Sequence, residues 1–417
     1  MPAEMPLEGV RILDLTRLLP GGFCSQWLAD FGADVIKVED TGAGDYIRHA
    51  PPYHEVDEAQ APGASSTRSA LFLSLNRNKR SIRLDLKSEA GRDAFLKLVE
   101  VADVVLEGFR PGVMDRLGVG FEKLIEVNPG IIYCAITGYG QDGPNRDRAG
   151  HDINYLGSTG LLDMTGSADG APVMPAGQIG DLGGGAMSAG FGLMTALFAR
   201  QRSGKGQMVD ISMTDGAMSW LAMPAGAYFA DGQVPARGSS ILNGGVCCYL
   251  PYEAADGWVS CGALEPKFWK AFCDGNERPD LIEHQFGPAG SEGWKMAAEV
   301  FRSKTKDEWK TFNDQYDCCI EPILDVGEAM ESDLARQRGM VVEIDQPGIG
   351  SVRQVGNPVK LSRTPALEPK PAPAIGQHTR EVLCEAGLSD EAVDELLDSG
   401  AAAGPEAESS QPGGFRA

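Results

Sequence analysis

Basic residues are scarce in this chain. Its 417 residues include 37 lysines and arginines against 59 aspartates and glutamates, so the formal net charge is −22. Such a balance repels phosphate backbones and anionic lipid surfaces, which argues against nucleic acid or a membrane as a partner over a broad surface. A local basic pocket for one anionic ligand is still compatible with the composition.

Zinc-ligand and disulfide patterns are missing as well. The nine cysteines include the adjacent pairs Cys247-Cys248 and Cys318-Cys319 but no Cys-x-x-Cys spacing. We interpret them as free thiols in a reducing compartment and expect no metal site. The chain also shows neither a signal-peptide pattern at its start nor an apolar run of about 18 residues, so a soluble cytoplasmic protein is predicted.

A dinucleotide-binding fingerprint is the third absence. Strand-like residues 10–15 and 34–38 flank a helical segment over 23–31, which predicts a βαβ opening and a parallel sheet. The turn between them contains Pro20-Gly21-Gly22 and lacks Gly-x-Gly-x-x-Gly, which disfavours an NAD site. Strands and helices alternate as far as Ile136 and predict a large, doubly wound (Rossmann-like) α/β domain.

The chain is too long for one hydrophobic core and favours at least two domains. After Asn243-Gly244-Gly245 the pattern changes to short alternating strands and helices, which predicts a smaller α+β domain. We expect a large α/β domain over 1–212, a linker helix over 213–240, the small domain over 241–335, a return linker with the C-terminal part of the large domain over 336–403, and a disordered tail over 404–417.

One dense basic cluster stands against the acidic background. It lies at residues 76–83 and includes Lys79, Arg80 and Arg83. Two interpretations are open at this point. The cluster is either a solvated edge of the sheet or a site that binds phosphate groups.

Few residues offer acid–base chemistry at neutral pH. His151, one of only five histidines, is followed directly by Asp152, and two further acids, Asp181 and Glu265, stand in glycine-flanked or apolar segments. An imidazole ordinarily titrates at about pH 6.5, which suits proton transfer. One imidazole with carboxylates is typical of a proton-transfer site, although spacing alone does not bring these residues together.

The residues around His151 resemble the family III CoA-transferases, and within them the α-methylacyl-CoA racemases. The resemblance covers about Leu7 to Leu388. The matching motifs are 28–35, 79–81, 84–87, 107–112, 137–141, 150–155, 180–181, 204–207 and 262–266. It implies an enzyme that inverts the α-carbon of 2-methyl-branched acyl-CoA thioesters by 1,1-proton transfer through an enolate. Two alternatives stay open: a CoA-transferase with a covalent intermediate on Asp181, and a non-catalytic acyl-CoA-binding protein.

The resemblance also implies roles for the acid–base residues. His151 and Asp181 would exchange the α-proton on opposite faces, and an apolar, glycine-lined site would raise the pKa of Asp181. Glu265 would hydrogen-bond the second ring nitrogen of His151. The backbone N–H of Asp152 would donate to the enolate oxygen. The family implies an interlocked homodimer, in which Glu265 comes from the partner chain.

Residues that hold CoA are implied in the same way. Lys79, Arg80, Arg83 and Arg110 would bind its phosphates and compensate for Asp40, which stands where the racemases commonly carry a basic residue. The further CoA-binding positions implied by the motifs are Leu84, Asp85, Lys87, Gly150 and Tyr155. CoA is part of the substrate, so we expect neither a separate cofactor nor a metal.

Overall fold

The computed structural model of the chain describes residues 5–57, 59 and 67–405. They fall into two compact units. Unit 1 comprises residues 1–155, 177–217 and 334–417, and unit 2 comprises residues 156–176 and 218–333. The predicted tail over 404–417 falls almost entirely outside the described residues.

Unit 1 is built on a sheet that has seven strands within the described residues, in the order β14-β5-β2-β1-β6-β7-β8. The strands are β1 (Arg11–Asp14), β2 (Asp34–Glu39), β5 (Arg80–Leu84), β6 (Val104–Glu107), β7 (Ile132–Thr137), β8 (Met208–Ser212) and the short β14 (Ala402–Ala403). Only β14 runs antiparallel. The six parallel strands follow the doubly wound order 3-2-1-4-5-6 when numbered along the chain. The predicted Rossmann-like sheet is therefore confirmed.

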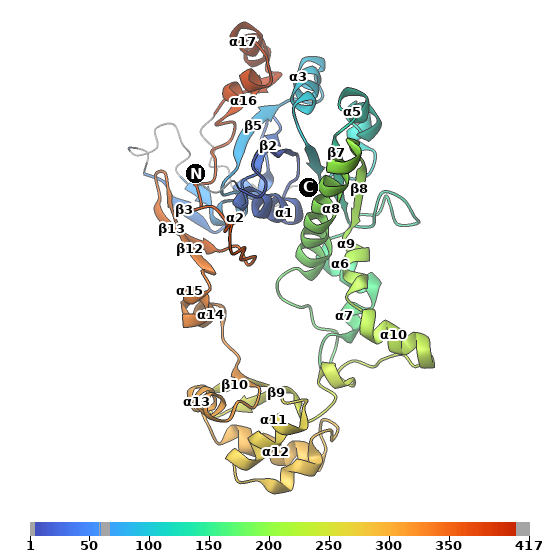
Figure 1. Cartoon of the computed structure of the whole chain (residues 1–417), viewed down its shortest axis with the longest axis vertical. Helices are drawn as coiled ribbons and strands as arrows, with labels where there is room; N and C mark the ends of the chain where they lie inside the picture. The colour runs from blue at the N-terminus through green and yellow to red at the C-terminus, as the bar shows by residue number, and fades with distance from the viewer. Residues whose placement is uncertain (1–4, 58, 60–66, 406–417) are drawn as a thin grey trace. The chain divides into compact units, whose positions relative to one another are not determined.

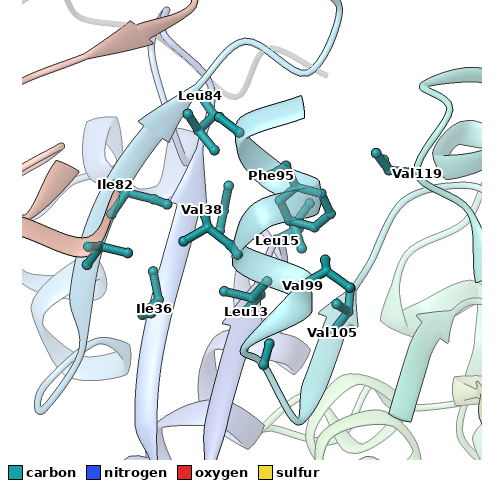
Figure 2. Packing of buried hydrophobic residues seen from close by; sticks show 14 of the residues in the cluster. Leu13, Leu15, Ile36, Val38, Ile82, Leu84, Phe95, Val99, Val105 and Val119 are labelled. Carbon is teal, nitrogen blue, oxygen red and sulfur yellow. The ribbon is translucent and has the colours of Figure 1, made fainter. Parts of the chain in front are cut away.

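Helices cover both faces of this sheet (Figure 1) because consecutive strand residues point to opposite sides. On one face, Leu13, Ile36 and Val105 pack against α3 (Glu89–Glu100) and its neighbours, as Figure 2 shows. On the other face, the adjacent residues Ile12 and Val35 pack against α1 (Leu19–Asp30) and α8 (Ser188–Ser203). Strands buried on both faces read as continuous apolar runs, which is why the sequence made them recognisable.

The order of the strands changes direction between β1 and β6. From β1 the chain continues to β2 and β5 on one side, and from β6 to β7 and β8 on the other. In open α/β sheets the loops that follow the carboxyl ends of two such strands diverge and leave a crevice. The loops after Asp14 and Glu107 are therefore the first places to look for a site.

The other elements of unit 1 extend the two layers or lie at the end of the sheet. They are η1 (Tyr46–His49), β3 (Tyr53–Glu55), β4 (Thr67–Ser69), α2 (Ala70–Leu75), α4 (Val113–Arg116), α5 (Phe121–Val127), the π-helix η2 (Ile179–Met187), α15 (Asp333–Gln337), β12 (Val341–Gln346), β13 (Gly350–Val355), α16 (Thr379–Glu385) and α17 (Asp390–Asp398). Among the described elements, α6 (Asp152–Thr159), α9 (Met213–Ser219) and, by its first residue, α15 cross the division between the units.

One expectation about hydropathy needs correction. The π-helix η2 continues directly into α8, and together they form a helical stretch of 25 residues from Ile179 to Ser203 that is long and apolar enough to cross a membrane. This stretch is weak support for a membrane span, because α8 contributes Ala189, Leu193 and Leu197 to the core of unit 1. Its apolar character comes from isoleucine, leucine, methionine, phenylalanine and alanine, and its glycines let it pack closely on its neighbours.

Unit 2 has its own core around an antiparallel sheet, β11-β10-β9. Its elements are α7 (Leu161–Met164), α10 (Ala222–Asp231), η3 (Ile241–Asn243), β9 (Tyr249–Ala254), β10 (Gly257–Gly262), α11 (Pro266–Gly275), η4 (Pro279–His284), α12 (Glu292–Arg302), α13 (Lys306–Tyr316), β11 (Ile320–Pro322) and α14 (Val326–Glu331). Stacked rings such as Tyr252 and Phe301, with centroids 4.1 Å apart, fill its centre. Strands and helices of this kind match the α+β architecture that the sequence predicts.

The boundaries of the units differ in detail from the predicted domains. The segment 156–176, which the sequence analysis places in the large domain, groups with unit 2. The predicted linker helix over 213–240 is two helices, α9 and α10, interrupted at Trp220 and Leu221, and the division between the units falls within α9. The interruption breaks an apolar pattern that looked continuous in sequence.

Candidate active site

A cleft of about 1110 Å³ opens in unit 1 where the strand order changes direction. It is bounded by the loops that follow three parallel strands, β1, β6 and β7, together with the start of η2. The residues that line it include 15–21, Tyr46, Ile47, Leu71, Leu75, 108–111, Tyr139, Arg146, 148–151, Asn154, Tyr155, Gln178, Asp181 and Met213. The structure therefore brings His151 and Asp181, which are 30 positions apart in sequence, to one cleft.

The loop that carries His151 is held by a tyrosine. The hydroxyl of Tyr155 donates to the carbonyl oxygen of Gly150 at 2.5 Å. Its ring leaves no room for a side chain at either Gly138 or Gly150, since a Cβ there would lie 2.5 or 2.7 Å from Tyr155 Cε1. The N–H of His151 donates to Asn154 Oδ1 at 3.0 Å. Tyr155 and Gly150, both predicted to bind CoA, thus also fix the backbone beside the imidazole.

Asp181 lies in the first turn of η2, and Asp152 holds its backbone. The N–H of Asp181 donates to Asp152 Oδ1 at 2.9 Å. Burial, and then the negative charge of Asp152, raise the pKa of Asp181 to about 7. This carboxyl group can therefore hold or release a proton near neutral pH, as an acid–base catalyst requires.

The glycines after Asp181 allow η2 and α9 to approach each other closely. A Cβ at Gly184 would lie 2.4 Å from the carbonyl oxygen of Met213, and a Cβ at Gly216 would lie 2.3 Å from the carbonyl oxygen of Gly184. Gly183, Gly184 and Gly185 are buried. These glycines therefore admit the backbone of α9 rather than only a ligand, and this close packing anchors η2.

Four arginines line the cleft, in a chain of net charge −22. Arg17 forms an ion pair with Asp40 at 2.7 Å, and Arg146 donates to the carbonyl oxygen of Gln141 at 2.8 Å. The guanidinium groups of Arg110 and Arg148 make no ion pair or hydrogen bond with any residue that the structure describes. Arg110 was predicted from the sequence and the other three were not, although Arg146 and Arg148 lie within four residues before the Gly-His-Asp motif.

The basic cluster at 76–83 is used differently from its predicted role. Lys79 is fully buried, and its Nζ contacts Asp14 at 3.3 Å, Gly22 O at 3.0 Å and Asn76 Oδ1 at 2.9 Å. Arg80 pairs with Asp34 at 2.7 Å and with Glu385 at 2.8 Å. Neither residue is among the described residues that line the cleft. Their charges are already neutralised by the fold, so their predicted phosphate contacts find no support here, and the solvated-edge alternative does not fit Lys79 either.

Arg83 is also engaged by the protein. Its guanidinium donates to the carbonyl oxygens of Thr41 and Gly42, at 2.5 and 2.9 Å, and so shapes the loop after β2. Leu84 is buried in the core, and Asp85 accepts the N–H of Lys87 in the turn that follows β5. Among the described residues that line the cleft, none of these four predicted CoA contacts occurs. The residue that pairs with Asp40 is Arg17.

Glu265 belongs to unit 2, where it is the exposed residue that precedes α11. Neither its carboxylate nor the ring of His151 hydrogen-bonds a described residue of this chain. Its pairing with His151 stays a prediction. The described residues contain no group of three or more histidine, cysteine, aspartate or glutamate side chains arranged to hold a metal ion.

Gln178 is a further residue that the sequence analysis did not single out. It lines the cleft three positions before Asp181 and adopts a left-handed conformation with φ of 46°. A non-glycine residue in this region is strained, and such residues gather at functional sites. The glycine that precedes Gln178 is the single feature of the sequence that could have drawn attention to it.

Comparison with known proteins identifies the family of this chain. Residues 7–379 match the sequence profile of CoA-transferase family III. The chain is 37% identical over 402 residues to alpha-methylacyl-CoA racemase of Mus musculus, covering 94% of this chain and 96% of that protein. It is 35% identical over 404 residues to succinyl-CoA:glutarate CoA-transferase of Mus musculus, covering 95% and 90%.

Solved structures agree with the sequence matches. The crystal structure of a CAIB/BAIF family protein from Brucella suis superposes with a TM-score of 0.78 at 29% identity, covering 92% of this chain and 100% of that one. The similarity therefore spans most of both units. The protein is an enzyme of CoA-transferase family III.

Proposed function

We propose that this enzyme epimerises the α-carbon of 2-methyl-branched acyl-CoA thioesters. The observation that carries the proposal is that His151 and Asp181 line the same cleft, together with a pKa of about 7 for Asp181. Inversion needs a base on one face of the α-carbon and an acid on the other, and the two must exchange roles between directions. A carboxyl group that ionises near neutrality serves in both roles.

The proposed reaction passes through an enolate. His151 takes the α-proton in one direction while protonated Asp181 supplies a proton to the opposite face, and the roles reverse in the other direction. The backbone N–H of Asp152 at the start of α6 is the donor we assign to the enolate oxygen. Arg110 and Arg148, with Arg17 and Arg146 beside them, would bind the phosphates of CoA.

Solvent-isotope exchange tests this proposal directly. A single epimer of a 2-methylacyl-CoA incubated with the enzyme in deuterated water should gain deuterium at the α-carbon and lose its configuration. CoA transfer to an added free carboxylic acid, without exchange at the α-carbon, would sink the racemase assignment. Binding without either reaction would identify a non-catalytic acyl-CoA-binding protein.

A CoA-transferase is the second candidate, since relatives named as transferases match this chain almost as well as those named as racemases. In that reaction the carboxylate of Asp181 attacks the thioester and carries the acyl group and then CoA covalently. Hydroxylamine added during turnover would convert such an intermediate to a hydroxamate at Asp181. Peptide mass spectrometry that finds Asp181 unmodified would favour the racemase.

We also propose that the enzyme is an interlocked homodimer in which Glu265 of the partner subunit orients His151. An exposed apolar stripe supports the proposal: Met187, Phe191, Met194 and Phe198 recur at helical spacing, and Phe191 is 78% exposed. Stripes of this kind mark interfaces between proteins. Light scattering during gel filtration should give twice the mass of one chain, and a monomeric mass would contradict the proposal.

A further inference from the structure

The segment between β1 and α1 forms a wall of the cleft and is strained. Residues 15–21 all line the cleft. Within this segment Leu18 adopts φ of 59° and ψ of −140°, a conformation that a branched L-residue avoids. Such a conformation costs free energy and persists only where the surrounding structure holds it.

One buried ion pair holds the peptide groups on both sides of Arg17. Lys37 Nζ donates to the carbonyl oxygen of Thr16 at 2.9 Å. The N–H of Leu18 donates to Asp45 Oδ1 at 3.1 Å. Lys37 and Asp45 pair with each other at 2.8 Å, and the side chain of each is 1% exposed.

A second buried acid, Asp14, also holds this segment through Thr16. Asp14 Oδ1 accepts both the N–H and the hydroxyl of Thr16, at 2.9 and 2.5 Å. The side chain of Thr16 lies so close to the first turn of α1 that a Cβ at Gly21 would be 2.2 Å from it. Thr16, two positions before Leu18, is thereby held through both its backbone and its side chain.

The charge on Lys37 is maintained by its surroundings. Burial disfavours the ammonium ion, but Asp45, Asp14 and Glu39 outweigh burial and raise its pKa above the usual value. Lys37 therefore donates to the carbonyl of Thr16 as a charged ammonium group at neutral pH. Charge-assisted hydrogen bonds of this kind are stronger than neutral ones.

We propose that Lys37 and Asp45 are positioning residues that hold Arg17 and Leu18 in the conformation that the CoA-binding cleft needs. The pair itself does not touch the ligand. It fixes the backbone so that the guanidinium of Arg17 stays at the cleft, next to Asp40 and 5.7 Å from the centroid of the Phe109 ring. The proposal rests on the proposed function only in taking CoA as the ligand.

A purely structural ion pair would behave differently from a positioning pair. If Lys37 and Asp45 only stabilise the sheet, their loss lowers the melting temperature and leaves the folded cleft unchanged. If they hold Leu18 against strain, their loss releases the segment, and the consequence depends on the residue at position 18. Glycine adopts positive φ without strain. In a Leu18→Gly variant the segment should therefore depend less on the Lys37–Asp45 ion pair.

The first experiment needs no ligand. Hydrogen exchange of the full-length protein, followed by mass spectrometry of peptides that cover residues 15–20, reports the release of the segment. Lys37→Met should speed exchange there by about tenfold or more while β7 and α8 stay protected. Arg200→Gln, which breaks a partly buried ion pair with Asp103 elsewhere in unit 1, is the matched control. Unchanged exchange at 15–20 in Lys37→Met would overturn the proposal.

The second experiment measures the affinity for free CoA by calorimetry, well below the melting temperature. Lys37→Met should weaken binding by about tenfold, and the loss should be clearly smaller when Lys37→Met is made in a Leu18→Gly background. Equal losses in both backgrounds would overturn the proposal. Asp45→Asn, which keeps an acceptor for Leu18 N–H, should show a milder version of both effects and serves if Lys37→Met does not fold.

The two experiments separate this proposal from the proposed function. A wild-type protein that does not bind CoA would refute the proposed function, and the exchange experiment would still decide whether Lys37 holds the segment. Exchange that changes as expected with normal CoA affinity would mean that the segment is held but is not needed by the ligand, which overturns the functional part of the proposal.

Discussion

Unit 1 contains two kinds of charged residue: buried ones paired with an opposite charge, and ones at the cleft without such a partner among the described residues. Beneath the cleft, Asp14, Lys37, Glu39, Asp45 and Arg48 are buried, and each has a partner of opposite sign. At the cleft, Asp181 is next to another acid, Asp152, and the guanidinium groups of Arg110 and Arg148 have no partner among the described residues.

The difference separates structural charges from functional ones. A charge that the fold compensates is stable in its ionised form and contributes to holding the backbone. A carboxylate beside another carboxylate has a raised pKa and can exchange a proton near neutral pH. A cation without a partner can still pair with an anionic ligand. Residue type alone does not distinguish the two groups, because both contain aspartates and arginines.

The largest expected effect comes from breaking a compensated pair. Glu39 and Arg48 pair at 2.7 Å, with side chains only 2% and 1% exposed. Glu39→Gln removes the charge of a buried carboxylate that pairs with the guanidinium of Arg48, so the free energy of unfolding should fall by about 3–5 kcal/mol. Denaturant titration measures this change. A loss below about 1 kcal/mol would show that this region does not depend on compensation.

The pH dependence of this loss has a definite sign. Burial opposes the ionised carboxylate, but Arg48 and Lys37 prevail and lower the pKa of Glu39 from 4.5 to about 2. Its stabilisation is therefore complete above about pH 4.5 and disappears as the pH falls toward 2. The difference in stability between wild type and Glu39→Gln should shrink across this window.

At the cleft, the same kind of change should affect activity rather than stability. Asp181→Asn cannot carry a proton, and His151→Ala removes the second proton-transfer group. Each should lower α-proton exchange by about 10²-fold or more, with little change in melting temperature. Isotope exchange followed by mass spectrometry measures the effect.

Glu107 provides a matched control for Asp181. Burial also raises its pKa to about 7, but it is not among the described residues that line the cleft. Glu107→Gln keeps an acceptor for the N–H of Phe109 and should retain most of the exchange activity. If Glu107→Gln and Asp181→Asn lost activity equally, a raised pKa would not mark the catalytic acid.

A smaller effect should follow from removing the like charge beside Asp181. Asp152→Asn keeps the oxygen that accepts Asp181 N–H but removes the repulsion that helps to raise the pKa of Asp181. The pKa of Asp181 should then fall. In the direction in which protonated Asp181 donates, the alkaline limb of the pH–rate profile should shift to lower pH. An unchanged limb would mean that Asp152 acts only through the hydrogen bond.

The sequence predicted part of this arrangement. The parallel sheet followed from apolar strands, and the resemblance led to His151 and Asp181, which the fold brings to one cleft. The sequence did not show that Lys79 and Arg80 already have partners, because Asp14, Asp34 and Glu385 lie far away in sequence. A cluster of positive residues shows where cations are, but only the fold shows whether anions have already reached them.

The smallest expected effect tests whether Arg148 or Arg80 contributes to binding acyl-CoA. Arg148→Gln removes a guanidinium that has no described partner at the cleft, whereas Arg80→Gln removes one that already pairs with Asp34 and Glu385. Two unit charges about 4 Å apart interact by about 1 kcal/mol even in bulk water, so Arg148→Gln should raise KM for acyl-CoA by about fivefold or more. This increase should diminish at high salt, because screening weakens the wild-type contact. Arg80→Gln should leave KM unchanged and lower stability slightly. The opposite pattern, with KM raised by Arg80→Gln alone, would restore the basic cluster at 76–83 as the phosphate site and would show that an ion pair within the protein can open to receive CoA.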